Sequence, residues 1–392
     1  MSNVVVLAAQ RTPIGKFMGS FSSLSAADLG VALVQPMLER AGVDAAHVGE
    51  LIFGCGRQAG SGPNVARQVS VRSGIPESQT AWTVNMACGS GLLAIIEGQQ
   101  AIERGDYDLA VVGGVESMTR LPYYLERARE GYRLGHGELT DGMYRDGFQC
   151  PLADQLMGAT AENLAEEFSI SREEQDRFAV ESQHRSERAR SEGRFDAEIL
   201  PVSVPGRKET KVVERDEHPR DGVKIESMAK LPAVFKKGGS VHAGNASGIT
   251  DGAAALVIAS EARAKELGIT PIGRLGASTR AGVEPRRMGM GPVPATQRLC
   301  ERTGLKLDDF DLVELNEAFA AQVIACDREL GLDRERLNVN GGAISLGHPI
   351  GATGARIVVT LLHELRRRSA RRGLATLCIS GGMGLALEVL AE

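Results

Sequence analysis

The chain has 392 residues, of which 43% are hydrophobic and 24% are charged, so it can form two or three globular domains with a sizeable core. Its formal net charge of -5 provides no basic field for nucleic acid, and we expect no nucleic-acid partner. No apolar run reaches the roughly 20 residues that span a bilayer, and the N-terminus does not resemble a secretory signal, so we expect no membrane association.

Six cysteines are dispersed along the chain, and no two of them stand in a CxxC pair. Dispersed cysteines in a long chain without an export signal are typical of a reducing compartment, so we expect free thiols and a cytoplasmic protein. Most free cysteines are inert small hydrophobic residues, and each one needs a further reason before chemistry is assigned to it. The six are Cys55, Cys88, Cys150, Cys300, Cys326 and Cys378.

The chain alternates predicted strands and helices, and it does so twice. In the first half these are a strand at residues 4–7, an amphipathic helix at about 26–41 closed by Gly42, a strand at 50–54, a helical stretch at 92–104 and a buried strand at 109–114. In the second half they are a strand at 272–280, a helix at about 294–303 closed by Gly304, a strand at 311–316, a helical stretch after 343 and a buried strand at 375–382. The repeat indicates an internal duplication with a period of about half the chain.

Strands that alternate with helices predict parallel sheets covered on both faces, so the predicted fold class is α/β. Two copies in one chain predict two such sheets packed with pseudo-twofold symmetry. We expect an N-terminal half at residues 1–117 and 249–270, an inserted domain at 118–248 and a C-terminal half at 271–392.

The predicted insert at 118–248 is rich in charge and glycine and poor in buried-strand signals. Ser171 and Glu174 form a capping box that opens a polar helix reaching about Ser191. Long irregular segments of compact proteins are usually functional, so we interpret the insert as a lid or a substrate-binding segment. The alternative is a solvated contact between subunits.

Cys88 lies at a predicted turn between a strand that includes Val84 and a following helix. The free backbone N–H groups and the positive potential of a helix N-terminus favour a thiolate over a thiol. The neighbouring Gly89 and Gly91 let a substrate approach the backbone closely. Cys88 is therefore the candidate nucleophile, and the alternative is a buried structural cysteine on a tight turn.

Three further residues are candidates for chemistry. His348 stands in a glycine-rich loop, where a neutral imidazole can take a proton from a thiol, although a turn histidine without a role is the alternative. Cys378 and Asn316 each lie at the end of a predicted strand, where sites of α/β sheets form. Taken alone, Cys378 is equally explained as a core cysteine and Asn316 as an ordinary loop residue. The pseudo-symmetry, however, would bring the segments of all four candidates towards one cleft.

The sequence lacks several motifs that carry other chemistries. It has no HExxH spacing, no Walker phosphate loop and no GxGxxG after a predicted strand. Their absence argues against zinc, nucleotide hydrolysis and dinucleotide binding. We expect no metal and no permanently bound cofactor.

The motifs found so far resemble those of the thiolase family, over nearly the whole chain and in the order of the family. The resemblance implies a duplicated αβαβα five-layer fold with an inserted loop domain, and an acyltransferase whose substrates are coenzyme A and acyl-CoA. The matching segments are the nucleophile loop at 85–91, the pantetheine loop at 243–248, the NEAF motif at 316–319, the GGAxxLGHP motif at 342–349 and a CxGGG-type motif at 378–384.

The resemblance also implies a role for each candidate residue. Cys88 would attack the acyl carbonyl and carry the acyl group, and His348 would activate it. His348, together with a water held by Asn316, would stabilise the thioester oxygen of the substrate. Cys378 would be the acid and base at the acetyl carbon, while the backbone N–H groups of Cys88 and Ser380 would form a second oxyanion hole.

Residues of the insert are implied in substrate binding. Arg220, Ser227 and Ser247 stand where the family contacts coenzyme A, and Met157 and, outside the insert, Phe319 are further implied substrate-binding residues. Met157 would narrow the acyl pocket.

Two positions depart from the family pattern: Ser380 replaces a usual glycine, and Leu156 replaces the histidine of a His-Met-Gly motif that is usual in short-chain biosynthetic thiolases. The first departure affects the oxyanion hole. The backbone N–H at position 380 remains a donor unless that position requires a positive φ, which serine rarely adopts. The second departure, the missing histidine, weakens the implication of a strict preference for acetoacetyl-CoA.

The implied reaction is the reversible Claisen condensation of two acetyl-CoA molecules to acetoacetyl-CoA and coenzyme A, or the thiolytic cleavage of 3-ketoacyl-CoA. A degradative 3-ketoacyl-CoA thiolase of fatty-acid β-oxidation, with broader chain length, is the first alternative. A ketoacyl synthase-like condensing enzyme and a non-catalytic thiolase-like scaffold are more distant ones. The family resemblance implies a homotetramer, a dimer of dimers.

Overall fold

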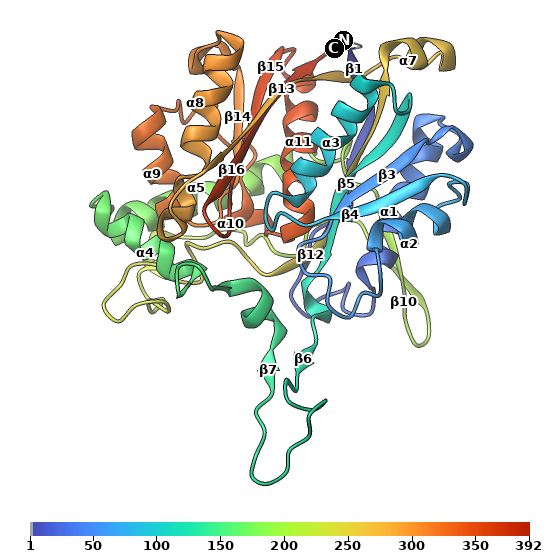
Figure 1. Ribbon diagram of the computed structural model, residues 1–392. Helices are drawn as coiled ribbons and strands as arrows, with labels where there is room; N and C mark the ends of the chain where they lie inside the picture. Colours follow the sequence, from blue (N-terminus) through green and yellow to red (C-terminus); the bar gives the residue numbers. More distant parts are fainter. Residues whose placement is uncertain (1–2) are drawn as a thin grey trace.

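The computed structural model describes residues 3–392, and nine main strands of these residues follow one another in one sheet. They are β1 (Val4–Arg11), β3 (Glu50–Gly54), β4 (Thr80–Val84), β5 (Leu109–Ser117), β12 (Thr250–Ser260), β13 (Gly273–Gly282), β14 (Leu312–Leu315), β15 (Arg372–Ile379) and β16 (Met383–Ala391). Their order is β14-β15-β16-β13-β1-β12-β5-β3-β4, and the short β2 (Gly15–Lys16) pairs with β12 (Figure 1).

The strand order confirms the predicted duplication, but the two predicted sheets are one continuous sheet, because β1 pairs with β13. β1 and β13 meet at the centre of the sheet through two residue pairs, Val5 with Arg274 and Val6 with Gly273. Outward from this junction, β12, β5, β3 and β4 on one side correspond to β16, β15, β14 and a parallel bridge at Leu337 on the other. The two halves are therefore related by a pseudo-twofold axis at the β1–β13 junction.

Helices complete a five-layer αβαβα arrangement, as the fold class predicted. The central pair α3 and α11 packs between the two halves, and each half carries a further helical layer on its outer face. The central helices are α3 (Ser90–Arg104) and α11 (Ile350–Arg367), and the outer ones are α1 (Ala26–Ala41) and α2 (Val65–Arg72), then α8 (Pro292–Thr303) and α9 (Ala320–Leu330). Three separate apolar cores fill the spaces between these layers.

The prediction of parallel sheets is wrong for the middle of each half. Only β3–β4, β3–β5 and β14–β15 are parallel, whereas β1, β12, β13 and β16 pair with their neighbours in antiparallel fashion. A helix that crosses between two strands makes them parallel, but a tight hairpin joins β15 to β16. The segment between β5 and β12 is the long insert, so this connection is no simple helical crossover either.

The helix signals in the sequence are confirmed at the helix ends. The predicted helix at 26–41 coincides with α1, and Gly42 after it has a left-handed φ of 65°. The capping box of Ser171 and Glu174 starts α5 (Arg172–Ser191), with both reciprocal hydrogen bonds present. These ends are specified locally, since side chains and a glycine satisfy backbone groups that the helix leaves free.

The segment 118–248 contains more regular structure than its sequence suggested. Besides α5, it holds α4 (Met157–Glu167), which was not predicted, and the hairpin of β6 (Tyr123–Tyr124) and β7 (Thr140–Asp141) that projects from the body of the protein (Figure 1). No helix among residues 3–392 has the length and hydropathy needed to cross a bilayer.

The remaining short elements connect these parts. They are η1 (Ala45–His47), η2 (Met118–Arg120), η3 (Tyr144–Phe148), β8 (Gln149–Cys150), β9 (Gln155–Leu156), β10 (Val202–Pro205), β11 (Thr210–Val213), α6 (Ile225–Met228), α7 (Glu261–Leu267), η4 (Pro285–Met290), η5 (Leu307–Asp309) and α10 (Ala343–Leu346).

A buried ion cluster ties the insert to the sheet. Arg11, at the end of β1, donates to Glu198 at 2.6 Å and to both carboxylate oxygens of Asp216 at 2.7 and 3.0 Å. The side chains of all three residues are almost fully buried. Removing one member of such a cluster leaves uncompensated buried charge, which costs more than the cluster itself contributes.

We therefore expect Arg11→Met to destabilise the protein by roughly 3–5 kcal/mol, because both carboxylates lose their cation. The measurement is the shift in the urea unfolding midpoint relative to the unmodified protein. Arg72→Met is the control, since Arg72 pairs with Asp28 at the surface, and an exposed pair contributes about 1 kcal/mol at most. Equal midpoints for the two variants would contradict the proposed contribution of the buried cluster.

Candidate active site

A cavity of about 640 Å³ opens where loops of both halves meet the insert. Eight of the residues predicted for the site line it together. They are Cys88, Met157, Arg220, Ser247, Phe319, His348, Cys378 and Ser380. The structure thus gathers residues that are almost 300 positions apart in the chain.

Two of the predicted residues do not line this cavity among the described residues, 3–392. Ser227 is exposed on α6, and its hydroxyl donates to the carbonyl of Lys224 at 2.5 Å. Asn316 is 1% exposed, and neither its side-chain oxygen nor its nitrogen has a hydrogen-bond partner within residues 3–392. A buried amide in this state can hold a water or a substrate group.

Cys88 stands on a sharp turn between β4 and α3, as its sequence context predicted. The preceding Ala87 has a φ of 45°, which is unusual for a residue with a side chain. Asn85 accepts a hydrogen bond from the Ala87 amide at 2.9 Å, and the Ser90 hydroxyl donates to the Ala87 carbonyl at 2.7 Å. These contacts hold the strained turn that presents the cysteine at the helix start.

The groups around Cys88 shift the pKa of its thiol in opposite directions. Burial of the sulfur raises the pKa of the thiol above its ordinary value, and the carboxylate of Glu116 adds to this. The positive charge of Arg57 and the backbone N–H groups of Ser380 and of Cys88 itself lower the pKa, because they stabilise the thiolate. The amides named for the second oxyanion hole therefore do face the sulfur.

His348 is positioned so that one ring nitrogen is available to the cavity. Its Nδ1 lies 2.6 Å from the Thr353 hydroxyl, which itself donates to the Pro349 carbonyl at 3.0 Å. The hydroxyl must then accept from Nδ1–H, and this network assigns the tautomer. Nε2, which has no partner among residues 3–392, is the acceptor that remains for a thiol proton.

The imidazole of His348 is neutral over the working range of most enzymes. Burial and, to a smaller extent, the positive charges of Arg356 and Arg57 together lower its pKa to about 3. A neutral ring is the form that can act as a base, and here it persists above pH 3.

We expect kcat/KM to show no loss of activity between pH 8 and pH 5.5 that follows a histidine titration near its ordinary value of about 6.5. Because the pKa is lowered, protonation of His348 begins only under much more acidic conditions. The measurement is kcat/KM against pH, with circular dichroism to separate unfolding from titration. An acidic limb centred near 6.5 that disappears in His348→Asn would contradict this expectation.

The hairpin between β15 and β16 places Cys378 and Ser380 at the cavity. Cys378 is the residue before the last of β15 and lies opposite Gly384, and the chain turns through Gly381 and Gly382, whose φ values are 89° and 88°. Ser380 is not among the residues with positive φ, so serine fits where the family has glycine and its amide remains a donor. Burial, and the nearby Cys88 sulfur, raise the pKa of Cys378 well above its ordinary value.

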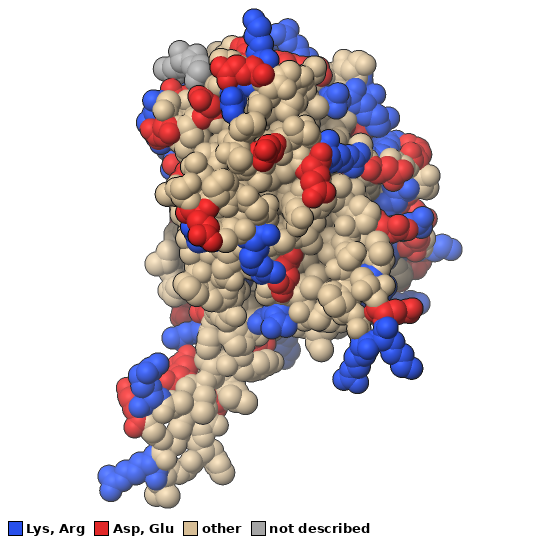
Figure 2. Space-filling model, turned by 90° about the vertical axis from the view of Figure 1, so that its right-hand side faces the viewer, with Lys and Arg blue, Asp and Glu red and all other residues tan. Residues whose placement is uncertain are grey.

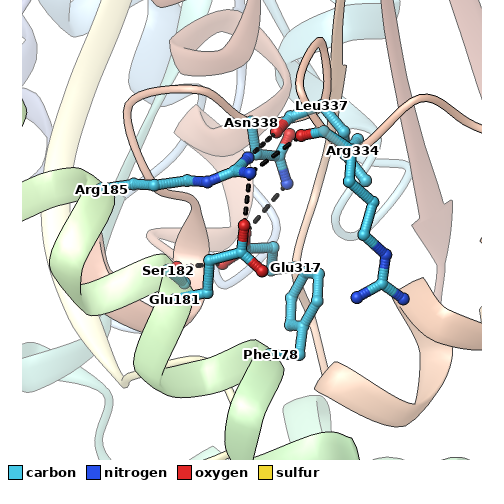
Figure 3. Close-up of a pocket in the computed structure, with 8 residues that line it drawn as sticks. All are labelled: Phe178, Glu181, Ser182, Arg185, Glu317, Arg334, Leu337 and Asn338. Atoms are coloured by element: carbon cyan, nitrogen blue, oxygen red, sulfur yellow. Dashed lines mark hydrogen bonds and ion pairs between the residues drawn. The ribbon is translucent and has the colours of Figure 1, made fainter.

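The residue after Asn316 braces the loop that leads to His348. Glu317 is buried, and its carboxylate accepts from the Ser182 hydroxyl at 2.7 Å, the Asn338 amide at 3.0 Å and the Ile344 N–H at 3.2 Å (Figure 3). Figure 3 draws the first two of these contacts, in which Ser182 comes from α5, Glu317 from the segment after β14 and Asn338 from the segment after α9. The insert therefore fixes the backbone on both sides of the catalytic candidates.

The acyl side of the cavity is narrowed by large side chains. Phe235 packs against Phe319 edge to face, with ring centroids 6.2 Å apart, and Met157 and Met288 join the same apolar cluster. Leu156, the position that departs from the family histidine, also lines the cavity. The wall around Cys378 is thus apolar and crowded, which favours a short acyl group.

The sequence did not single out several other residues that line the cavity. They are Lys16, Phe17, Arg57, Met118, Tyr144, Phe148, His218, Val234, Phe235, Ile249, Met288 and Ile350. Arg57 follows the end of β3 by three positions, so the rule that sites form at strand ends could have found it. The insert residues carry no such signal, because only the folded chain brings them to the cavity.

Comparison with known proteins agrees with this architecture. The model of the thiolase N-terminal domain matches residues 4–262, and that of the thiolase C-terminal domain matches residues 269–391. The chain is 51% identical to an acetyl-CoA acetyltransferase of Pseudomonas aeruginosa, with all of both chains covered. It is 50% identical to an acetyl-CoA acetyltransferase of Escherichia coli, with 99% of each covered.

Solved structures show the same fold. A crystal structure of the Bacillus anthracis acetyl-CoA acetyltransferase superposes with a TM-score of 0.98 at 44% identity, covering 100% of this chain and 99% of that one. The human mitochondrial 3-ketoacyl-CoA thiolase superposes with a TM-score of 0.97 at 41% identity and the same coverage. Both family models together span nearly the whole chain, and this protein belongs to the thiolase family.

Proposed function

We propose that this thiolase is an acetyl-CoA acetyltransferase, which reversibly joins two acetyl-CoA molecules to acetoacetyl-CoA and coenzyme A. The observation that carries the proposal is the meeting of Cys88, His348 and Cys378 in one narrow cavity. The relatives of about 50% identity that bear this name support it.

The first half of the proposed reaction loads an acetyl group on Cys88. Nε2 of His348 takes the thiol proton, and the sulfur attacks the thioester carbonyl of acetyl-CoA. The negative charge that develops on the carbonyl oxygen is stabilised by His348 and by a water held by Asn316. Coenzyme A leaves with the proton from His348, and the acetyl group remains on the sulfur of Cys88.

The second half forms the carbon–carbon bond. Cys378 removes a proton from the methyl carbon of the second acetyl-CoA, and that carbon attacks the acetyl-thioester of Cys88. The backbone N–H groups of Cys88 and Ser380 stabilise the oxyanion of this thioester. The bond to Cys88 then breaks, and the Cys88 sulfur takes the proton that Cys378 removed from the methyl carbon, which restores both residues. Acetoacetyl-CoA is released, and thiolysis is the same sequence in reverse.

Binding of coenzyme A is proposed along the wall formed by the insert. Ser247 lines the cavity, and its amide donates to the Ala318 carbonyl at 2.9 Å, which joins the pantetheine loop to the NEAF motif. Arg220 is exposed at the same cavity and suits a phosphorylated ligand. Ser227 is not among the described residues, 3–392, that line the cavity, and it would contact only the outer part of coenzyme A.

The direct test is thiolysis of acetoacetyl-CoA by free coenzyme A, in the absence of acyl carrier protein. We expect turnover, and its absence from a folded protein would overturn the assignment and favour a scaffold or a carrier-dependent condensing enzyme. The loss of absorbance of the acetoacetyl-CoA enolate measures the rate.

A degradative thiolase with broader chain length remains the second candidate, since the human 3-ketoacyl-CoA thiolase is also closely similar in structure. We expect kcat/KM to fall by at least about tenfold between 3-ketoacyl-CoA substrates of four and eight carbons, because Met157, Phe235 and Phe319 crowd the cavity. A panel of substrates of increasing length makes this measurement. A rise in kcat/KM with length would instead support the degradative role.

We also propose a cytoplasmic homotetramer, a dimer of dimers. The projecting β6–β7 hairpin exposes Tyr123, Leu134 and Leu139, and the edge strand β4 exposes Trp82. Figure 2, which looks at the right-hand side of Figure 1, shows a broad surface with few charged side chains above this hairpin. Unpaired strand edges and exposed apolar side chains are typical of subunit contacts, and free cysteines suit a reducing compartment.

The division of the chain at residues 117, 248 and 270 is likewise a proposal. β5 ends at Ser117 and β12 begins at Thr250, so the intervening segment is inserted in the chain between two strands that pair with each other in the sheet. Residues 1 and 2, which the prediction includes in that half, lie outside the described residues.

A further inference from the structure

Arg57 is a buried cation in the wall of the cavity that contains Cys88 and His348. Its side chain is 6% exposed, and it forms no ion pair with any residue of the described range 3–392. An arginine keeps its charge in any protein environment, so a full positive charge is held beside the reacting groups. Burial of such a charge without a paired carboxylate is costly and is found mainly where it serves a function.

The guanidinium of Arg57 is held in place by backbone carbonyls. Nη1 donates to the Gly56 carbonyl at 3.2 Å, and Nη2 donates to the Gly147 carbonyl at 3.1 Å. Nε has no partner among residues 3–392. The Gly56 carbonyl also accepts from the Asn85 side chain at 3.2 Å, so the anchor of Arg57 and the turn that carries Cys88 share one atom.

The backbone around Arg57 is fixed by one buried carboxylate. Glu116, at the end of β5, accepts from the amides of Gly56, Arg57 and Gly351 at 2.9, 3.0 and 2.9 Å. It also accepts from the Cys55 thiol at 3.4 Å. This carboxylate uses its oxygens on these four donors and forms no ion pair with the guanidinium of Arg57, although the two charges interact at longer range.

We propose that Arg57 is a positioning residue whose fixed charge stabilises the Cys88 thiolate that forms when the thiol gives its proton to His348. A fixed positive charge stabilises the anion on the sulfur and disfavours a second positive charge on the imidazole. The first effect offsets part of the cost of burying the thiolate, while the second keeps the free imidazole unprotonated and able to accept the thiol proton. The inference rests on the proposed role of Cys88 as the nucleophile.

The other charged and titratable groups around the sulfur are consistent with this role. Glu116 from β5 opposes Arg57, but its effect on the pKa of Cys88 is smaller than that of Arg57. Cys378 from β15 is a neutral thiol at neutral pH, because its pKa is raised well above the ordinary value. His348 is neutral as well, and Arg57 is the cation that lowers the pKa of Cys88 against the effect of burial.

The test compares Arg57→Lys with Arg57→Gln in the full-length protein. Both variants lose the double anchoring of the guanidinium, but only lysine keeps the charge. Alkylation of Cys88 by iodoacetamide is followed against pH, with peptide mass mapping to separate Cys88 from the other cysteines. The pH profile of kcat/KM for thiolysis is measured in parallel, and Arg40→Gln, at an exposed position of α1, is the matched control.

We expect Arg57→Gln to move the alkylation profile to higher pH and to slow alkylation at neutral pH roughly three- to tenfold. The range reflects the lower thiolate fraction, partly offset by the greater nucleophilicity of a more basic sulfur. Arg57→Lys should stay close to the unmodified protein. Equal profiles for all three proteins, or equal shifts for both variants, would overturn the inference.

The Cys88→Ala variant distinguishes a wrong proposed function from a wrong role for Arg57. If Cys88→Ala retained thiolysis, the nucleophile would be wrong even though the alkylation profile still depended on residue 57. If Cys88→Ala abolished thiolysis and the profile did not depend on residue 57, only the role of Arg57 would be wrong.

Discussion

Replacing Cys88 by alanine is expected to abolish thiolysis of acetoacetyl-CoA, with kcat reduced by roughly 10⁴-fold or more. No other group in the cavity combines a helix start, a strained turn and two facing amides, and none can replace the sulfur as the acyl carrier. The loss of the covalent intermediate removes both halves of the reaction. Steady-state thiolysis measures the effect, and intact mass after incubation with acetyl-CoA should show no stable adduct.

The matched control for this variant is Cys300→Ala. Cys300 lies on α8, is partly exposed and does not line the cavity among the described residues. Its substitution should leave kcat within about twofold, because a surface change away from the site has little effect on structure. Wild-type thiolysis by Cys88→Ala would refute the proposed nucleophile, whichever result the control gives.

Local signals in the sequence were sufficient to predict the turn that carries the candidate nucleophile. Helix ends are set by caps within a few residues, so the start of α5 at Ser171 and the end of α1 at Gly42 could be predicted. The turn before α3 is also local, since Ser90 and Asn85 hold it through contacts within five residues of Cys88. These features do not depend on how distant parts of the chain are arranged.

Strand direction and the binding wall could not be predicted in the same way. The antiparallel pairing of β5 with β12 depends on the return of the chain after the insert, which no local pattern encodes. His218, which belongs to the insert, enters the cavity only because the insert packs against the strand ends. The assignment of the histidine tautomer likewise required Thr353, whose hydroxyl is recognisable as a partner only in the folded loop.

Replacing Cys378 by alanine is expected to separate acyl transfer from carbon–carbon chemistry. Cys88 keeps its turn, its amides and His348, so acetyl exchange between acetyl-CoA and labelled coenzyme A should continue at a rate within about tenfold of the original. Condensation and thiolysis should fall roughly 10²–10⁴-fold, because no acid or base remains at the acetyl carbon. Intact mass should show the acetyl adduct on the protein.

The control for Cys378→Ala is Cys326→Ala, which removes a second buried thiol close to Cys378 but outside the cavity in the described chain. It should retain condensation. Normal condensation by Cys378→Ala would refute the assignment of this residue as the acid and base, whereas loss of acetyl exchange would show that the substitution disturbs Cys88 itself.

The separation of the two steps also follows from the charges of the two thiols. The Cys88 thiolate is one of the groups that raise the pKa of Cys378, so both sulfurs are not ionised together. Acetylation converts Cys88 to a neutral thioester and removes this repulsion, which eases ionisation of Cys378 at the moment when a carbon base is needed. An alkylated Cys88, which is also neutral, should therefore make Cys378 titrate at lower pH than it does beside a free thiolate. Measuring the reactivity of Cys378 against pH before and after selective alkylation of Cys88 checks this coupling, and an unchanged profile would contradict it.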